Sequence, residues 1–176
     1  MPYDTTILKK PTKNKFQTIS CTLGIKGPRY NGRVDTVQHI DFEINTIALL
    51  IYEPERFKRA PVYSDAPEYV ALVMEKEEIF AEKIRALMTK RRKHRERDMY
   101  DIAFLIRKGI PINKNAILKK LKESEINPKI ADLIQSIESI KSNWKYLTPL
   151  VNTPLEPYEE IKKLIINNDD LEKILK

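Results

Sequence analysis

The spacing of apolar residues changes near residue 75, and this change limits the folds open to the chain. Before it, short segments alternate between apolar and polar residues, as in strands that cover one face of a sheet. After it, apolar residues recur with the period of an amphipathic helix. Strands followed by helices indicate an α+β fold. We therefore expect a β-rich part over residues 1–74 and a helical part over residues 75–176.

The same pattern predicts individual elements. Strands are expected over residues 15–25, 37–44 and 47–52, and a further short strand begins at Val62 or at Tyr69. They would form a small sheet with one face packed by the first helices. Helices are expected over residues 75–92, 97–108, 114–124, 128–142, 156–167 and 168–175. The expected helix N-caps are Asn113, Asn127 and Asp169.

The composition limits the class of protein. Hydrophobic residues make up 41% of the chain, which is enough for a core at this length. No stretch approaches the roughly 20 apolar residues of a membrane span, and the N-terminus lacks the apolar segment of a signal peptide. Cys21 has no second cysteine with which to form a disulfide, and His and Cys are too few for a zinc site. We expect a cytoplasmic protein with no membrane contact.

A basic run lies between the first two expected helices. The net charge of +7 favours anionic partners such as nucleic acid. Within residues 90–97, the side chains of Arg91, Arg92, Lys93 and Arg95 could neutralise phosphates of a bound RNA. Alternatively, the run is a solvated helix end, where the helix dipole favours cations. The sequence leaves both interpretations open.

A lysine interrupts the apolar stripe of the first expected helix. On a helical wheel Lys83 falls between Ile79 and Leu87, whereas Glu82 and Arg85 fall on the polar side. A buried ammonium group is unfavourable unless it is paired or reaches a cavity. Either Lys83 extends past the stripe to water, or it reaches a pocket and binds a phosphate.

An aspartate interrupts the apolar side of the second expected helix in the same way. Asp98 falls between Ile102 and Leu105, and Asp101 lies nearer the edge of the stripe. A carboxylate near the start of a helix also favours capping. Asp98 is therefore either a cap or a member of a polar site shared with Lys83.

Two carboxylates leave one face of the strand expected over residues 37–44. Asp41 and Glu43 are two positions apart, so they lie about 7 Å from each other along the strand. Paired carboxylates can hold Mg²⁺ against nucleotide phosphates. Alternatively, they belong to the solvent-exposed face of an antiparallel sheet.

Together these segments resemble a known family. EEIFAEKIRAL (77–87) followed by RDMYDIAFL (97–105) is similar to the paired helices of AbiEii/AbiGii-type nucleotidyltransferases. That family has an E-x-x-x-A-E-K-x-x-A-L helix, a variable basic loop and an R-D-x-x-D helix. QHIDF upstream resembles its later acidic strand, and WKYL and PYEE downstream resemble its helical tail. The resemblance extends over most of residues 17–170.

The resemblance implies a nucleotidyltransferase-like sheet packed by helices and a toxin of a toxin–antitoxin or phage-defence system. Such proteins use NTP and Mg²⁺, and some modify tRNA 3′ ends. By motif, Lys83 would bind nucleotide phosphates and Asp98 would complete the catalytic polar cluster. Asp41 would be the third carboxylate, and the basic loop would face RNA. A cognate antitoxin is the implied partner.

The sequence also departs from the family pattern. The family begins with a G-[GS]-[TS] turn and a D-x-D strand, which cradle the triphosphate and hold the metals. The chain contains no Gly-Gly, Gly-Ser or D-x-D. Three interpretations follow. The chain is part of a nucleotidyltransferase whose first motifs lie on a separate or missing piece, through a truncated gene, a frameshift or a complementing partner. Alternatively, it is a non-catalytic relative that binds RNA or a protein partner through the basic loop, or an isolated enzyme with an unfamiliar metal site. We expect the isolated chain to be inactive in transfer.

Overall fold

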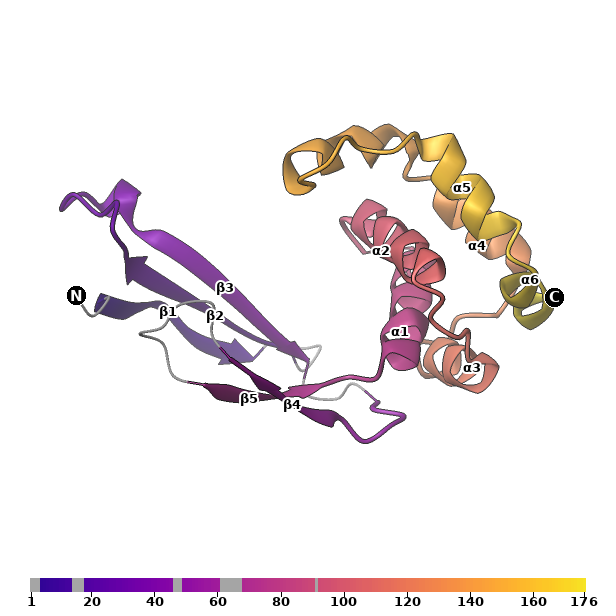
Figure 1. The fold of residues 1–176 in the computed structure, drawn as a ribbon, viewed down its shortest axis with the longest axis horizontal. Coiled ribbons are helices and arrows are strands. Elements are labelled where there is room, and N and C mark those ends of the chain that lie inside the picture. Colours follow the sequence, from indigo (N-terminus) through magenta and orange to yellow (C-terminus); the bar gives the residue numbers. More distant parts are fainter. Residues whose placement is uncertain (1–3, 14–17, 46–48, 61–67, 91) are drawn as a thin grey trace. The chain divides into compact units, whose positions relative to one another are not determined.

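The computed structural model describes residues 4–13, 18–45, 49–60, 68–90 and 92–176. The chain divides into two compact units, an N-terminal unit (Met1–Ala48) and a C-terminal unit (Leu49–Lys176). Strands come first along the chain and helices later (Figure 1). The predicted α+β class is therefore confirmed.

The N-terminal unit contains a three-stranded antiparallel sheet. Its order is β1 (Asp4–Lys13), β2 (Thr18–Lys26) and β3 (Gln38–Asn45) (Figure 1). A 3₁₀ turn, η1 (Val34–Thr36), precedes β3. The strands predicted over residues 15–25 and 37–44 correspond to β2 and β3. The sequence did not predict β1, which carries Pro11 and two register shifts. An edge strand tolerates both, and among the described residues β1 is paired on one side only.

Gly24 allows close packing within this sheet. A Cβ atom placed on Gly24 would lie 2.8 Å from the side chain of Leu8 and 3.0 Å from that of Val37. Those distances are shorter than van der Waals contact, so a larger residue would displace both neighbours. The glycine therefore lets Leu8 of β1 lie over β2.

A β-hairpin and an irregular segment begin the C-terminal unit. The hairpin pairs β4 (Glu55–Arg59) with β5 (Tyr69–Val73) in antiparallel register. It confirms the strand that the sequence placed at Tyr69, whereas Val62 lies outside the described residues. The prediction of a strand over 47–52 is wrong for residues 49–52, which belong to no strand. Residues 47 and 48 lie outside the described ranges.

Helices make up the rest of the C-terminal unit. They are α1 (Lys76–Met88), α2 (Arg95–Arg107), α3 (Lys114–Glu123), α4 (Ile130–Glu138), α5 (Tyr158–Ile166) and α6 (Asp169–Leu175) (Figure 1). A 3₁₀ segment, η2 (Lys141–Leu150), follows α4, which ends before residue 142, where the sequence predicted its end. None of the helices in the described ranges has the length and hydrophobicity that crossing a lipid bilayer requires.

The helix caps agree only in part with the sequence-based predictions. The side chain of Asn113 accepts a hydrogen bond from Ala116 N at 3.1 Å, as predicted for the start of α3. At α6 the cap is Asn168 and not Asp169, because Asn168 Oδ1 accepts from Leu171 N at 3.1 Å. The prediction of Asn127 as a cap is also wrong, because α4 begins after Lys129 with no side-chain cap.

The hydrophobic core of the described residues lies in the C-terminal unit. Its buried apolar side chains all fall between Phe80 and Leu175. Trp144 and Tyr158 pack edge to face, with ring centroids 5.8 Å apart. Trp144 Nε1 donates to Glu156 O at 2.8 Å, and Tyr158 Oη donates to Ile137 O at 3.1 Å. Both aromatic residues thus contribute apolar area while their polar atoms are satisfied.

Candidate functional site

Helices α1 and α2 bring Lys83 and Asp98 together. Lys83 Nζ lies 3.2 Å from Asp98 Oδ1 and 2.6 Å from Asp101 Oδ2. Asp98 and Asp101 are one helical turn apart on α2, so both can face the same side chain of α1. The predicted meeting of this cation with Asp98 is therefore observed. Asp101, which the helical wheel places nearer the edge of the stripe, is the nearer partner.

Burial distinguishes the members of this cluster. The side chain of Asp98 is 3% exposed, whereas that of Lys83 is 29% exposed. Burial by itself would lower the pKa of Lys83, but the hydrogen bonds and charges of Asp101 and Asp98 outweigh it and raise the pKa. Lys83 therefore stays protonated, and part of its side chain remains open to a ligand.

The two carboxylate oxygens of Asp98 differ in their hydrogen bonding. Its Oδ2 lies 3.4 Å from Arg92 Nε, which is within ion-pair distance. No group in the described part of the chain donates a hydrogen bond to that oxygen. Nor does Asp98 cap α2, whose N-cap is His94 without a side-chain cap. The buried carboxylate is thus balanced in charge but not saturated in hydrogen bonds.

The basic segment before α2 has members with different environments. Arg92 and Lys93 are exposed, whereas Arg95 is half-buried. Arg95 Nη1 donates to Leu87 O at 3.2 Å, and its Nη2 donates to Ser139 Oγ at 2.9 Å. Those bonds join the start of α2 to α1 and to the end of α4. Arg91 lies outside the described residues, and the RNA-binding role of the segment stays a prediction.

The carboxylates of β3 belong to the N-terminal unit. Asp41 and Glu43 are both exposed, and Asp41 Oδ1 accepts a hydrogen bond from Thr22 Oγ1 at 2.6 Å. They pair in register with Thr22 and Ser20 of β2. Across the described residues, no three His, Cys, Asp or Glu side chains gather as a metal site would require. The use of Asp41 and Glu43 as metal ligands stays a prediction.

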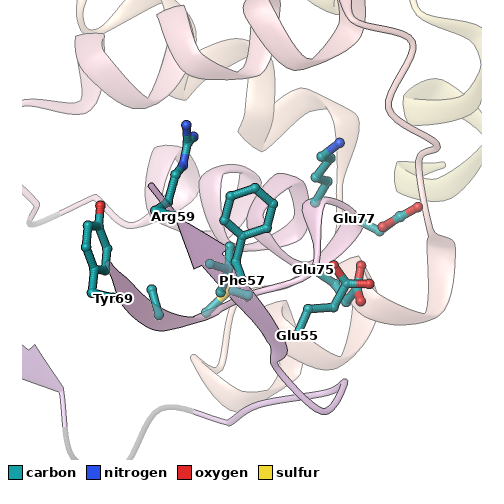
Figure 2. A pocket seen from close by; sticks show the side chains of 10 residues that line it. Glu55, Phe57, Arg59, Tyr69, Glu75 and Glu77 are labelled. Atoms are coloured by element: carbon teal, nitrogen blue, oxygen red, sulfur yellow. The ribbon is translucent and has the colours of Figure 1, made fainter. Parts of the chain in front are cut away.

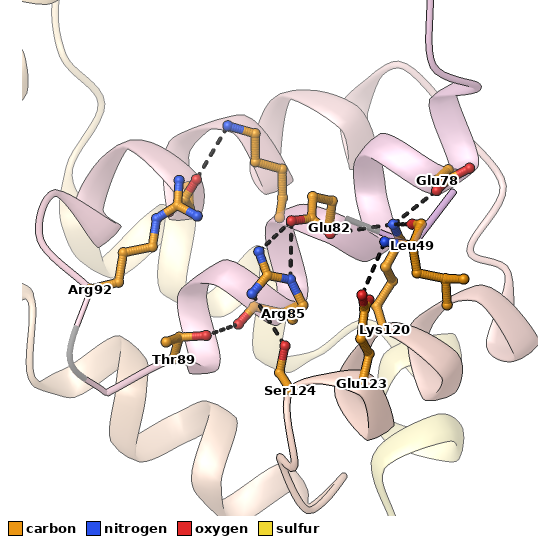
Figure 3. Close-up of polar contacts among 11 residues, drawn as sticks. Leu49, Glu78, Glu82, Arg85, Thr89, Arg92, Lys120, Glu123 and Ser124 are labelled. Atoms are coloured by element: carbon orange, nitrogen blue, oxygen red, sulfur yellow. Dashed lines mark hydrogen bonds and ion pairs between the residues drawn. The ribbon is translucent and has the colours of Figure 1, made fainter. Parts of the chain in front are cut away.

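A second, more deeply buried ion pair was not predicted from the sequence. Glu78 is 0% exposed and Lys120 of α3 is 1% exposed, and Lys120 Nζ lies 2.8 Å from Glu78 Oε1 (Figure 3). Burial would raise the pKa of Glu78, but the hydrogen bonds from Lys120 and from the main chain of Ile51 and Tyr52 lower it. Lys120 lies between Ala116 and Ile117 on a helical wheel. That is the signal that singled out Lys83, so the sequence could have revealed Lys120 as a buried lysine, but not Glu78 as its partner.

The Glu78–Lys120 pair holds the irregular segment 49–52. Glu78 accepts hydrogen bonds from Ile51 N at 2.9 Å and from Tyr52 N at 3.0 Å. Lys120 Nζ donates to Leu49 O, and Glu123 Oε1 accepts from Leu49 N at 3.0 Å (Figure 3). Side chains of α1 and α3 therefore satisfy main-chain groups that a strand would have paired with a neighbour.

Adjacent motif residues of α1 face different helices. Lys83 pairs with α2, whereas Glu82 pairs with Arg85 and lies 3.6 Å from Lys120 of α3 (Figure 3). Arg85 in turn donates to Ser124 Oγ at 3.3 Å. The expectation that Glu82 and Arg85 point to the polar side was wrong, because α3 packs there and leaves both half-buried. The A-E-K motif thus links three helices.

The motif helices and the strand before them also match a known family. A family model described as "Nucleotidyl transferase AbiEii toxin, Type IV TA system" matches residues 4–165. The chain belongs to the AbiEii nucleotidyltransferase toxin family. The match includes β3 and the helices that carry Lys83 and Asp98. No curated protein and no solved structure matches significantly. The type IV toxin–antitoxin assignment of the AbiEii family implies a cognate antitoxin.

This AbiEii-family chain also has a pocket of about 650 Å³ between its hairpin and the start of α1. Figure 2 shows Arg59 and Tyr69 at one end, Glu55 and Glu75 at the other, and Phe57 between them. Burial, followed by the charge of Glu55, raises the pKa of Glu75. The acidic end would repel an anionic ligand. The pocket is therefore a poorer place for a triphosphate than the surroundings of Lys83.

Proposed function

We propose that this AbiEii-family chain supplies the phosphate-binding lysine of a nucleotidyl transfer from NTP to RNA. The observation that carries the proposal is the arrangement of Lys83, whose side chain is partly exposed and whose ammonium pairs with buried Asp98 and with Asp101. A fixed cation stabilises negative charge on a triphosphate without having to reorganise during the reaction. Lys83 would bind the phosphates, and Asp98 would hold its ammonium in place.

The carboxylates of β3 fit a role in holding Mg²⁺. Asp41 and Glu43 leave the same face of one strand, and both are exposed. Magnesium is commonly held by one or two carboxylates together with water and substrate phosphates. When bound, the ion would neutralise charge on the triphosphate. Thr22 would orient Asp41 through its hydrogen bond of 2.6 Å.

The transfer would require a further segment. The chain has no glycine-rich turn and no D-x-D, which in the family pattern cradle the triphosphate and hold the metals. Without those motifs, Lys83 would bind the phosphates of an NTP only weakly. We propose that a complementing subunit or segment provides both motifs, and that residues 1–176 do not transfer nucleotides alone.

Transfer can be measured with labelled NTPs, Mg²⁺ and tRNA. The chain alone should transfer nothing detectable, and a supplied segment that carries the glycine turn and D-x-D should restore transfer. Lys83→Ala should abolish the restored activity, because the fixed positive charge is lost. Lys122→Ala removes an exposed lysine of α3 and should leave the activity unchanged.

Two outcomes would contradict this proposal. Robust Mg²⁺-dependent transfer by the chain alone would show that no further segment is required. Restored transfer that survives Lys83→Ala would remove Lys83 from phosphate binding. Circular dichroism of each variant would separate these outcomes from loss of the fold.

A second function is RNA or protein binding without catalysis. The exposure of Arg92 and Lys93 beside α2 favours RNA among these. Each phosphate contact to single-stranded RNA contributes about 0.7 to the slope of log affinity against log salt. Neutralising Arg91, Arg92 and Lys93 should therefore reduce that slope by roughly 2. The matched triple variant at Lys114, Lys119 and Lys122 of α3 should keep it. An unchanged slope in the first variant would exclude this site.

A further inference from the structure

A second hollow in the C-terminal unit lies where the start of α2 meets η2. Its volume is about 340 Å³. The lining combines cations, one acid, an amide and an aromatic ring: Arg92, Lys93, His94, Arg95, Glu96, Asn143 and Tyr146, with Ile140 at its apolar side. Arg92 also pairs with Asp98, so this hollow adjoins the Lys83 cluster.

Glu96 is the unusual member of this lining. Its side chain is 4% exposed, and its Oε1 lies 3.4 Å from His94 Nδ1. Within the described ranges its Oε2 has no hydrogen-bond partner. A buried carboxylate oxygen without a donor is unfavourable, and a ligand that brings an N–H group would relieve it.

The other side chains favour an anion and a flat ring. Arg92 and Lys93 are exposed beside the acid, so a ligand must satisfy positive and negative groups together. Tyr146 is 60% exposed, and Lys145 Nζ lies 5.5 Å from the centroid of its ring. Exposed aromatic rings stack on nucleobases, and nearby cations neutralise the phosphates. A nucleotide has all of the required groups.

We propose that this hollow binds one nucleotide of the RNA acceptor and selects a base that carries an exocyclic amino group. Tyr146 would stack on the base, and the Glu96 carboxylate would turn its buried Oε2 into the hollow to accept a hydrogen bond from the amino group. Arg92 and Lys93 would contact the adjoining phosphates. Uracil has no amino group, and its N–H lies between two carbonyl oxygens that a carboxylate repels. The inference relies on the proposed function only for RNA as the acceptor.

Binding can be tested without transfer. Fluorescence anisotropy with oligonucleotides of about six nucleotides compares oligo-C with oligo-U, whose bases differ at the edge that would face Glu96. The full chain should bind oligo-C about tenfold more tightly, as expected for a hydrogen bond to a charged group. Glu96→Gln should remove most of this preference, because an amide can also donate to a uracil carbonyl. Glu160→Gln, at an exposed acid of α5, should preserve it.

A second variant tests the aromatic contact independently of the buried acid. Tyr146→Ala should weaken binding of both oligonucleotides by about tenfold, through loss of stacking. Phe104→Ala removes another exposed ring of this unit and should change neither affinity. Equal affinity of the unmodified chain for oligo-C and oligo-U would overturn the proposal. So would a preference that survives Glu96→Gln, or binding that is insensitive to Tyr146→Ala.

The results also separate this inference from the proposed function. A cytosine preference that depends on Glu96, without any nucleotidyl transfer by the completed enzyme, would support base selection by the hollow and contradict the proposed transfer. Transfer without a base preference would support the proposed function and exclude base selection by the hollow.

Discussion

At the scale of single residues, charged side chains that lie among apolar neighbours form two ion pairs between helices. Among the described residues, Glu78 and Lys120 form the most deeply buried ion pair, and Asp98 with Lys83 forms a more open one. A buried pair gains little net stability over apolar residues of the same size, but removal of one partner leaves an uncompensated charge. We infer that Glu78 and Lys120 are chiefly a means of holding the main chain of 49–52.

The Glu78–Lys120 pair predicts strongly non-additive effects on stability. Lys120→Met and Glu78→Gln should each lower the free energy of unfolding by about 3–5 kcal/mol. The double variant should lose much less than the sum, because neither charge is left alone. Urea denaturation measures all three values. The exposed pair of Lys141 and Glu159 is the matched control, and each single change there should leave the free energy of unfolding nearly unchanged. Additive losses at Glu78 and Lys120 would contradict the assignment.

The pH dependence of stability follows from the same residue. Burial alone would raise the pKa of Glu78, but Lys120 and the main-chain N–H groups together lower it below its ordinary 4.5. Its stabilising contribution is therefore present above pH 4.5 and is lost as pH falls through the lowered folded-state pKa. Unfolding free energies measured by urea at decreasing pH should fall less steeply in Glu78→Gln. Glu160→Gln should keep the original slope, and an equal slope in Glu78→Gln would refute the prediction.

At the scale of elements, α2 shows how local chemistry fixes a boundary. Gly109 has a φ of 66°, and its N–H donates to Ile106 O at 2.9 Å while Ile110 N donates to Leu105 O at 3.1 Å. Both bonds close the end of the helix with a residue in the left-handed conformation. A Cβ at this position would meet no atom within 4 Å among the described residues, so any penalty there comes from the backbone.

Gly109 therefore predicts a pure conformational effect. Gly109→Ala should destabilise the C-terminal unit by about 1 kcal/mol, because an L-residue disfavours positive φ. Gly109→Asn should cost less, since asparagine tolerates that conformation better. Thermal unfolding followed by circular dichroism compares the two variants. Equal stability of the alanine variant and the unmodified protein would show that the helix end relaxes.

The elements also show what the sequence could and could not predict. The helices and the Lys83–Asp98 meeting follow from apolar periodicity, because each polar residue interrupts a stripe that must be buried. Residues 49–52 were expected in a strand because they are apolar, yet Glu78 and Lys120 bind their main chain from positions distant in sequence. Asp101 and Glu96 owe their importance to neighbours that only the fold supplies. The local pattern shows which polar residues interrupt an apolar stripe, but it does not identify the distant main-chain groups that such residues bind.

At the scale of the whole molecule, the two units differ in how many apolar side chains they bury. The buried apolar side chains of the described residues all lie in the C-terminal unit, whereas Ile40, Phe42 and Ile44 of β3 are exposed. Regions with few buried apolar contacts open at lower free energy than a packed core. The two units should therefore differ in stability within one chain.

Unfolding should begin in the N-terminal unit. Hydrogen exchange measured along a urea titration should show amides of β2 and β3 losing protection before those of α1 and α2. Trp144, the single tryptophan, reports the C-terminal unit by fluorescence and should change at the higher urea concentration. Coincident transitions by both methods would show that the units unfold as one.

The hydrogen bonds to the main chain of residues 49–52 affect which substitutions we expect among homologues. Glu78, Lys120 and Glu123 recognise only amide and carbonyl groups of that segment, and the side chains of Leu49 and Leu50 are exposed. We therefore expect the two leucines to vary among homologues. Because a change of Glu78 or Lys120 alone would leave a buried charge unpaired, we expect these two residues to covary.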